Sequence, residues 1–489
     1  MRQSRVDQML NRHAAVGLAV GVVRDGSLEF FHGHGYASLG LRTPVTPDTV
    51  FRVASITKTF TAIAVMQLWE QGRLDLDGPA DEYLRAFRLV PAKATIAIPT
   101  VRQLLTHTAG LPEVRRPRDV FKPIFGETVP AGHRIPPLAE FYRDGLPVDC
   151  EPGTRFAYTD HAFATLGQIV EDVSGEPFDR YLRGNVFESL GMSNTDLIRS
   201  PRVQPNLATG YTIGARGVRP VDDYEVVTAG AGAAYSSVRD MATYVAALLG
   251  SGSILKPATL AMMFEPQYQP DPRVPGLGLA FWRGEAGGHR VVEHGGILTG
   301  YHSQIFVAPD AGVGVLAFTN GARGAMLWLP AEVGGLLSAE LGVPEPAIRT
   351  DIPQRPDLWP DLCGWYAVPG RLSDARTREM AGAGIEVFVR RGQLMMRVLS
   401  PLPAVYRGFP LHPDDENDPY VFRIDLSGFG MGTVRIIFSQ RPGLGTTAAH
   451  LDVYPMTAYK RPGITNPRRL VAGAAGALAA GWLIRRTLT

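Results

Sequence analysis

Residues 51–68 read FRVASITKTFTAIAVMQL, and from Ile56 onward the apolar residues of this stretch recur at helical spacing. Ser55 stands where a helix N-cap or first-turn residue belongs. Lys58 follows three residues later, so on a helix the two side chains share one face and the amine can reach the hydroxyl. The sequence therefore predicts a helix that begins near Ser55 and carries a serine and a lysine on its first turn.

This pair has a chemical reading and a structural one. A serine hydroxyl becomes a nucleophile when a base takes its proton, and a lysine amine can do so if burial lowers its pKa. The start of the helix also directs backbone N–H groups at a developing oxyanion. In the structural alternative, Ser55 caps the helix and the Lys58 amine reaches solvent. The chain has only five lysines among 49 basic residues. At average serine usage, the number of Ser-x-x-Lys matches expected by chance is therefore roughly 0.25.

Composition limits the class of protein. The chain has 489 residues, which is more than one core accommodates and predicts two or more domains. The charged fraction of 20% is that of an ordinary globular protein, and the net charge of +2 with interspersed signs excludes a dedicated nucleic-acid partner. Only Cys150 and Cys363 occur, which excludes a disulfide framework and fits a reducing compartment. Residues 16–23 read as a first strand rather than a signal peptide, so we expect a cytoplasmic protein.

Hydrophobic periodicity divides the chain. Residues 16–36 form a predicted β-hairpin around the Asp25-Gly26 turn, helical patterns follow to about Pro266, and period-two alternation then begins with residues 277–282 and continues to Thr319. The predicted domains are a catalytic domain over 1–345, a linker over 346–360, a β-barrel-like domain over 361–462 and an Ala/Gly-rich apolar tail over 463–489. In the tail, Leu470 to Ile484 would span roughly 22 Å as a helix, short of the ~30 Å hydrocarbon core, which leaves membrane-surface contact open.

Two further segments carry candidate chemistry. A Pro-Gly turn at residues 152–153 leads to Tyr158 and Asp160 at the start of a predicted helix, where Tyr158 is either a core residue or a site residue. His294-Gly295-Gly296 lies between predicted strands. Adjacent glycines in a strand indicate that a ligand approaches the backbone, or else a glycine bulge.

The ordered series Ser55-x-x-Lys58, Tyr158-x-Asp160 and His294-Gly295-Gly296 resembles the penicillin-recognising serine hydrolases, above all the class C β-lactamase and esterase branch. The resemblance covers residues 16–341, and the later strands are similar to a lipocalin-like β-domain. It implies an α+β fold in which N- and C-terminal strands join one antiparallel sheet, flanked by helices and a helical subdomain, followed by a small all-β domain.

The resemblance also implies roles for individual residues. Ser55 would be the acylated nucleophile, Lys58 and Tyr158 together the proton-transfer pair, and His294 part of the opposite wall with Gly295 and Gly296. The N–H groups of Ser55 and Ile297 would form the oxyanion hole. No metal and no organic cofactor is expected.

Two departures from the family pattern shape the functional hypothesis. Asp160 stands where the family usually has Asn, so it can accept but not donate hydrogen bonds when ionised, and it can hold Lys58 charged. His294 stands where penicillin-active members carry a lysine, so a substrate carboxylate would lack a permanent cation. We therefore expect an esterase or amidase that acts on a small-molecule ester or amide. The alternatives are a D-amino-acid peptidase or β-lactamase, and a catalytically silent binding protein; the oligomeric state is not legible.

Overall fold

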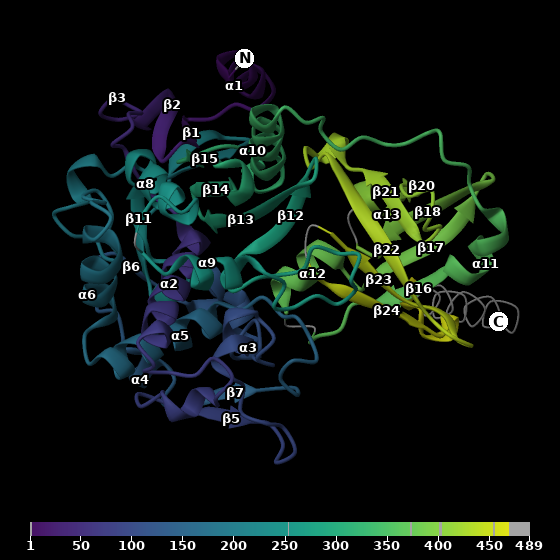
Figure 1. The fold of residues 1–489 in the computed structure, drawn as a ribbon, viewed down its shortest axis with the longest axis horizontal. Helices are drawn as coiled ribbons and strands as arrows, with labels where there is room; N and C mark the ends of the chain where they lie inside the picture. The colour runs from purple at the N-terminus through teal and green to yellow at the C-terminus, as the bar shows by residue number, and fades with distance from the viewer. Residues whose placement is uncertain (1, 253, 372–373, 401–402, 453–454, 469–489) are drawn as a thin grey trace, which may run out of the picture. The chain divides into compact units, whose positions relative to one another are not determined.

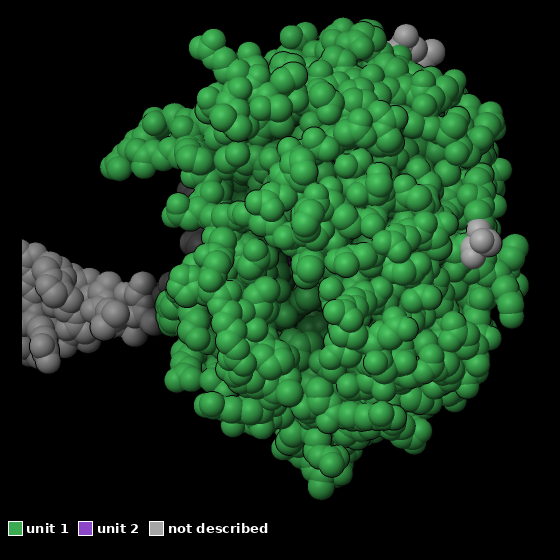
Figure 2. Space-filling model, turned by 90° about the vertical axis from the view of Figure 1, so that its left-hand side faces the viewer, with its two compact units in different colours: residues 1–269, 275–345, 429–431 green, residues 270–274, 346–428, 432–489 purple. Residues whose placement is uncertain are grey.

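The computed structural model describes all residues except 1, 253, 372–373, 401–402, 453–454 and 469–489. The chain forms two compact units. Unit 1 comprises residues 1–269, 275–345 and 429–431, and unit 2 comprises residues 270–274, 346–428 and 432–489. Unit 1 fills the view of Figure 2, where its surface is hollowed near the centre. The apolar segment from Leu470 to Ile484 lies outside the described residues, and among those described no helix is long and apolar enough to cross a membrane.

A seven-stranded antiparallel sheet organises unit 1, in the order β12-β13-β14-β15-β1-β2-β3. Strands from both ends of the unit meet in it, because β1 pairs with β15, placing Leu18 opposite Thr319. The predicted hairpin around Asp25-Gly26 is present as β1 and β2. The strands are β1 (Gly17–Arg24), β2 (Ser27–Ser38), β3 (Thr43–Pro44), β12 (Trp282–Ala286), β13 (His289–Leu298), β14 (Tyr301–Ala308) and β15 (Val313–Thr319).

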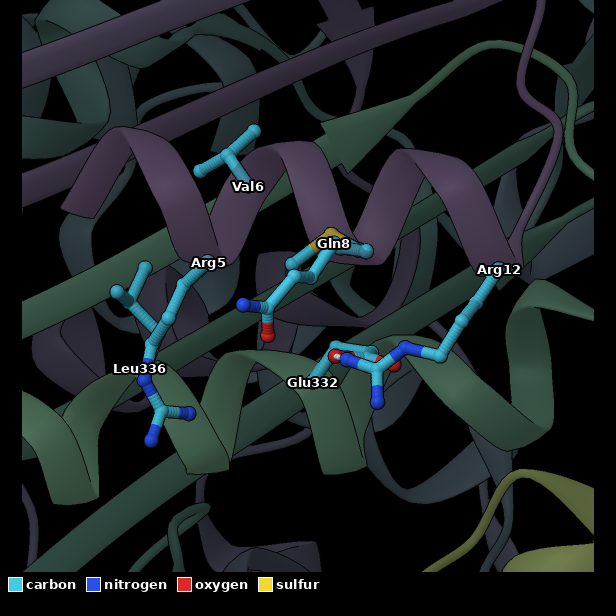
Figure 3. Close-up of a pocket in the computed structure, with 7 residues that line it drawn as sticks. Arg5, Val6, Gln8, Arg12, Glu332 and Leu336 are labelled. Carbon is cyan, nitrogen blue, oxygen red and sulfur yellow. Dashed lines mark hydrogen bonds and ion pairs between the residues drawn. The ribbon is translucent and has the colours of Figure 1, made fainter. Parts of the chain in front are cut away.

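Helices cover both faces of this sheet (Figure 1). On one face, α1 (Arg2–Arg12) and α10 (Ala325–Leu341) share an apolar cluster with the strands. A small pocket lies between these two helices, where Arg12 Nη2 donates to Glu332 Oε2 at 2.7 Å (Figure 3). On the other face, α8 (Val238–Leu248) contacts β1 and β15 and leads into the helical region. The N-terminal helix α1 was not predicted, because its sequence is mostly polar.

The helical region is built around α2 (Thr57–Glu70), which is buried on almost every side and contacts α5 and α7. The elements around it are α3 (Val101–Leu105), α4 (Leu138–Phe141), α5 (Asp160–Ser174), α6 (Phe178–Leu182), α7 (Ala229–Gly232) and α9 (Pro257–Phe264). Short strand pairs complete it: β4 (Val50–Arg52) with β11 (Tyr235–Ser237), β5 (Leu89–Pro91) with β7 (Leu146–Val148), β6 (Thr128–Pro130) with β10 (Tyr224–Val226), and β8 (Tyr211–Gly214) with β9 (Gly217–Pro220).

Unit 2 is a nine-stranded antiparallel sheet in the order β19-β18-β17-β16-β24-β23-β22-β21-β20, with an apolar core that includes Tyr366, Ile436 and Phe438. Its strands are β16 (Gly364–Ala367), β17 (Ile385–Arg390), β18 (Gln393–Val398), β19 (Phe409–Pro410), β20 (His412–Pro413), β21 (Val421–Asp425), β22 (Thr433–Arg441), β23 (Gly445–Leu451) and β24 (Thr457–Arg461). Short helices accompany them: α11 (Trp359–Leu362), α12 (Ala375–Ala381) and α13 (Pro403–Tyr406). The expected α+β fold followed by an all-β domain is confirmed.

Two local expectations were wrong. Residues 277–281 are not a strand, since β12 begins only at Trp282. Ser55 is neither the N-cap of α2 nor part of it, because it lies in a separate 3₁₀ turn, η1 (Ala54–Ile56), directly before the helix. The reason is the backbone of Ala54, whose φ of +50° is incompatible with a continuous right-handed helix.

Candidate active site

Ser55 is held on a turn fixed from two sides. The N–H of Val53 donates to the carbonyl of Ala234 at 3.0 Å, and Ser303 Oγ donates to the carbonyl of Val53 at 2.8 Å. Ala54 then takes a left-handed conformation that costs a non-glycine residue about 1 kcal/mol and persists only where its surroundings impose it. The strained turn thus presents Ser55 immediately before α2.

Lys58 connects the serine to residues distant in sequence. Its Nζ donates to Ser55 Oγ at 3.1 Å, to Asp160 Oδ1 at 2.6 Å and to the carbonyl of Ala231 at 2.8 Å. An ammonium group is a hydrogen-bond donor only, and all three of these partners are acceptors. The side chain of Lys58 has no exposed surface, which excludes the alternative in which its amine reaches solvent.

The charge state of Lys58 follows from this surrounding. Burial alone would lower the pKa of its amine, but attraction to Asp160 and Tyr158, with hydrogen bonds to both, outweighs burial and raises the pKa above its ordinary value. Lys58 is therefore an ammonium group at neutral pH. It cannot accept a proton from Ser55 in that state.

Tyr158 lies over the amine of Lys58 and is positioned by His107. Lys58 Nζ is 4.8 Å from the centroid of the Tyr158 ring, and the rings of His107 and Tyr158 have centroids 4.3 Å apart. The flanking backbone is fixed as well, since Thr159 N donates to His107 Nδ1 at 3.3 Å and Ala157 N donates to the carbonyl of His107 at 2.8 Å. His107 therefore anchors the loop, and the side chain of Thr159 caps α5.

His294 lies on β13 and is 2% exposed. Its Nδ1 lies 2.7 Å from the carbonyl of Gly295, which requires Nδ1 to carry the proton in the neutral ring. Burial, reinforced by the charge of Lys58, lowers the pKa of His294 to about 3. His294 is thus neutral at physiological pH and supplies no cation.

Gly296 allows β13 to approach the Ser55 turn. A Cβ at this position would lie 2.2 Å from the carbonyl oxygen of Val53 and 2.3 Å from Ser303 Oγ, closer than any real contact. Adjacent glycines predicted that a ligand or a bulge lies close to this backbone. At Gly296 the group that lies close is the Ser55 turn of the same chain. Ile297 follows on the same strand, with its side chain 52% exposed.

Sequence reasoning missed two contributors. Trp282 stacks on Tyr158, with centroids 5.9 Å apart, and lies 6.3 Å from the ring of His294. It therefore joins the two walls. The second is α7, whose Ala231 carbonyl binds Lys58. Gly230 packs its Cα against the backbone of Phe163, where a Cβ would lie 2.4 Å from the carbonyl oxygen. The run of alanine and glycine at 229–234 was the available signal for such close packing.

The structure brings Ser55, Lys58, Tyr158 and Asp160 into one hydrogen-bonded or stacked group. Asp160 binds Lys58 directly, as one of the two expectations for this residue had it. The ring of His294 contacts Trp282, which stacks on Tyr158. The charge of Lys58 also acts on His294, since it helps to lower the pKa of the imidazole. Within the described residues no three His, Cys, Asp or Glu side chains are grouped as metal ligands. A serine hydroxyl bonded to a buried cation, with a phenol ring beside that cation, is an arrangement suited to acyl transfer.

Comparison with known proteins gives the same picture. The family model described as Beta-lactamase matches residues 2–331. The chain is 29% identical over 273 residues to the putative penicillin-binding protein PbpX of Bacillus subtilis, covering 54% of this chain and 62% of that protein. It is 27% identical over 359 residues to a D-aminopeptidase of Gluconobacter oxydans, covering 72% and 64% respectively. The alignments thus span less than two thirds of these curated relatives.

Solved structures share the fold. An octameric penicillin-binding protein homologue from Pyrococcus abyssi matches with a TM-score of 0.61 and 23% identity, covering 94% of this chain and 99% of that one. A class C β-lactamase from Rhodobacter sphaeroides matches with a TM-score of 0.53 and 23% identity, covering 65% and 93%. The resemblance drawn from the three motifs is confirmed.

Proposed function

Because this chain belongs to the Beta-lactamase family, we propose that it is a serine hydrolase that acts through an acyl-enzyme on Ser55. The observation that carries the proposal is the buried ammonium of Lys58, which donates to Ser55 Oγ at 3.1 Å while Asp160 holds its charge at 2.6 Å. Burying the charge of Lys58 costs desolvation free energy that an apolar side chain at this position would not cost. Catalysis explains why a charged group is kept beside a serine, whereas packing does not.

In the proposed mechanism, Tyr158 and Lys58 have different roles in proton transfer. Lys58 is charged and cannot accept a proton, so the proposed acceptor of the Ser55 proton is the oxygen of Tyr158, acting in its deprotonated form beside the ammonium group. Ser55 Oγ then attacks the substrate carbonyl carbon, forming a C–O bond while the carbonyl electron pair moves to oxygen. The N–H groups of Ser55 and Ile297 stabilise this oxyanion.

Collapse of the tetrahedral intermediate completes acylation. The bond to the alcohol or amine leaving group breaks, and Tyr158 returns the proton to that group. A water molecule then attacks the acyl carbon and gives its proton to Tyr158. When the bond to Ser55 Oγ breaks, Tyr158 returns that proton to Ser55 Oγ, the acid is released and the starting enzyme is restored. Lys58 remains charged throughout and serves as the electrostatic partner of the phenolate.

The proposed substrates are esters or uncharged amides of small carboxylic acids. Neutral His294 offers no cation for a substrate carboxylate. The facing rings of Tyr158 and Trp282 present apolar surface to the acyl or leaving group. The D-aminopeptidase relative and the structure described as EstCE1, a hydrolase with promiscuous acyltransferase activity, keep amide and ester hydrolysis both within the proposal.

The test is intact-mass analysis after incubation with a fluorophosphonate, together with turnover of p-nitrophenyl esters of increasing acyl length. We expect one adduct on Ser55 and ester turnover that falls at least about 10³-fold in Ser55→Ala. Ser27→Ala, an exposed serine on β2, is the matched control and should behave as wild type. Absence of an adduct, with equal turnover in wild type and Ser55→Ala, would favour a catalytically silent binding protein.

The same assay separates the enzyme alternatives. Faster hydrolysis of a chromogenic cephalosporin than of any ester would identify a β-lactamase, and preference for D-alanine p-nitroanilide would identify a D-amino-acid peptidase. Preference for esters or achiral amides supports the proposal as stated.

A further inference from the structure

A second polar cluster lies buried in the helical region of unit 1. It consists of Glu127, Tyr142, His161 and Thr228, each of which is 1% exposed. They come from four parts of the chain: Glu127 precedes β6, Tyr142 follows α4, His161 is in the first turn of α5, and Thr228 precedes α7. We call these four residues the Glu127 cluster. Polar groups buried to this degree are kept in place by hydrogen bonds to one another.

Two hydrogen bonds and one ionic contact connect the members of the Glu127 cluster. Thr228 Oγ1 donates to Glu127 Oε2 at 2.9 Å, and the hydroxyl oxygen of Tyr142 lies 2.8 Å from His161 Nδ1. His161 Nε2 is 3.9 Å from Glu127 Oε1, which joins the two pairs. Burial raises the pKa of Tyr142 well above its usual value, and the charges of Glu127 and Asp160 add to this effect. The phenol therefore keeps its proton, and Asp160 is near enough to the cluster to act on it.

The backbone fixes the position of Glu127. Its N–H donates to the carbonyl of Ile124 at 3.0 Å, and its carbonyl accepts from the N–H of Val227 at 2.8 Å. Ile124 and Phe125 have φ values of +43° and +53°, a left-handed conformation that ordinary residues avoid and that persists where the surroundings impose it. The bonds to Val227 and Thr228 follow one another, so Glu127 holds two successive residues directly before α7.

Thr228 uses its hydroxyl for this contact instead of capping its own helix. A threonine at an N-cap usually accepts a hydrogen bond from the first turn of the helix that follows. Among the described residues the α7 cap has no such side-chain bond, and the Thr228 hydroxyl donates to Glu127. Because α7 is only about one turn long, contacts outside it must hold it in place. The bond to Glu127 therefore orients the start of α7.

The Glu127 cluster adjoins two of the acceptors that bind Lys58. The N–H of Ala231 donates to the carbonyl of Thr228 at 2.8 Å, and the Ala231 carbonyl accepts from Lys58 Nζ, also at 2.8 Å. His161 directly follows Asp160, whose Oδ1 accepts from Lys58 at 2.6 Å. A displacement of the cluster is therefore passed to the ammonium group through very few bonds.

We propose that Glu127 is a positioning residue of the active site: by bonding Thr228 it orients α7 and thereby holds the Ala231 carbonyl on the Lys58 ammonium group. This inference rests on the proposed function. Its consequence is that the placement of Lys58 beside the nucleophile depends on a carboxylate that acts through α7 and not on Lys58 itself.

The first test observes the Lys58 ammonium group and does not depend on activity. The chain has only five lysines, so labelling with 15N-lysine gives a simple spectrum in which Lys58 is assigned by its loss in Lys58→Met. Thr228→Val removes the hydroxyl and keeps the branched shape, whereas Thr228→Ser keeps the hydroxyl. Thr195→Val is the matched control, because Thr195 is also buried and donates to a carboxylate, Asp240 Oδ2, at 2.7 Å.

The measured quantity is the exchange rate of the Lys58 Nζ protons with water at neutral pH. An ammonium group that loses a buried acceptor is less protected, so we expect exchange to accelerate at least about 10-fold in Thr228→Val. Thr228→Ser and Thr195→Val should keep the wild-type rate. A wild-type rate in Thr228→Val would overturn the proposal, whether or not the protein hydrolyses esters. So would exchange in wild type as fast as at the exposed Lys93.

The second test is kinetic and separates kcat from KM. The Ala231 carbonyl acts on Lys58 and not on the substrate in the proposed mechanism. We therefore expect Thr228→Val to lower kcat for p-nitrophenyl acetate at least about 5-fold while KM stays within about twofold. Thr228→Ser should restore kcat, and Thr195→Val should behave as wild type. A wild-type kcat in Thr228→Val, or a change in KM alone, would contradict positioning.

If Thr228→Val does not fold, Glu127→Asp decides the question. This variant keeps the charge but withdraws the carboxylate by one methylene, so Thr228 must lose its hydrogen bond or move. The same acceleration of exchange at Lys58 is then expected, and a wild-type rate would overturn the proposal. If wild type forms no fluorophosphonate adduct and turns over no ester, the proposed function fails, and exchange at Lys58 alone decides the role of Glu127.

Discussion

Lys58 Nζ lies 2.6 Å from Asp160 Oδ1, closer than the 3.1 Å that separates it from Ser55 Oγ. The strongest partner of the amine is therefore a carboxylate and not the nucleophile. This relationship keeps Lys58 protonated, which is why the proposed mechanism assigns the role of base to Tyr158.

Asp160→Asn should lower the pKa of Lys58, because the carboxylate is one of the groups that raise it. In the proposed mechanism the charged form of Lys58 supports the Tyr158 phenolate, so activity is lost at high pH when Lys58 deprotonates. We expect the alkaline limb of the kcat/KM profile to move down by about 1–3 pH units in the variant. The measurement is ester hydrolysis across pH, with acyl-enzyme formation followed in a single turnover. An unmoved alkaline limb would show that Asp160 does not govern the charge of Lys58.

Gly296→Ala should damage both stability and activity. The added Cβ would meet the carbonyl of Val53 at 2.2 Å, so β13 must move away from the Ser55 turn. Overpacking of this kind costs about 1–3 kcal/mol. Thermal unfolding and ester turnover are compared with Gly284→Ala on β12, where the new Cβ would lie 3.9 Å from Val291 Cβ, an ordinary contact. Equal melting temperatures for the two variants would refute the close approach.

Glu293→Gln should stabilise the protein increasingly as pH rises. Burial raises the pKa of Glu293 to about 7, despite a hydrogen bond from Gln304. Between the ordinary pKa of a glutamate, about 4.5, and 7, the folded state binds more protons than the unfolded state, so the free energy of unfolding falls as pH increases through this window. A glutamine remains neutral and avoids this loss.

The check is the melting temperature of Glu293→Gln relative to wild type at pH 5 and at pH 8. The difference should grow toward pH 8, whereas Glu285→Gln, at an exposed position on β12, should show the same small difference at both values. A difference that shrinks with pH would mean that Glu293 is ionised in the folded protein.

Much of the fold could be predicted because its signals are local. The Asp25-Gly26 turn between alternating residues specifies the first hairpin, and helical periodicity specifies α2. The 3₁₀ turn at Ser55 could not be predicted, because the left-handed backbone of Ala54 depends on its surroundings in the folded protein.

The sequence predicted which motif residues belong to the candidate site, but it did not predict which residues they contact. Lys58 meets Asp160 across 102 positions and Ala231 across 173, and no local pattern announces such pairs. Trp282 belongs to an alternating stretch, but alternation does not say which face lines a site.

The left-handed backbone at Ala54 and the bare Cα of Gly296 have a joint consequence for how this sequence can change. A Cβ at position 296 would lie 3.1 Å from the Cβ of Ala54, so the two positions share one small volume. Glycine at position 54 would adopt its positive φ without strain and vacate part of that volume, but it would leave the Ser55 turn less rigid. That exchange alone does not make room for an alanine at 296, because the closer contacts of the new Cβ are with the carbonyl oxygen of Val53 at 2.2 Å and with Ser303 Oγ at 2.3 Å. Natural variation or design at position 296 is therefore limited first by the backbone of the Ser55 turn.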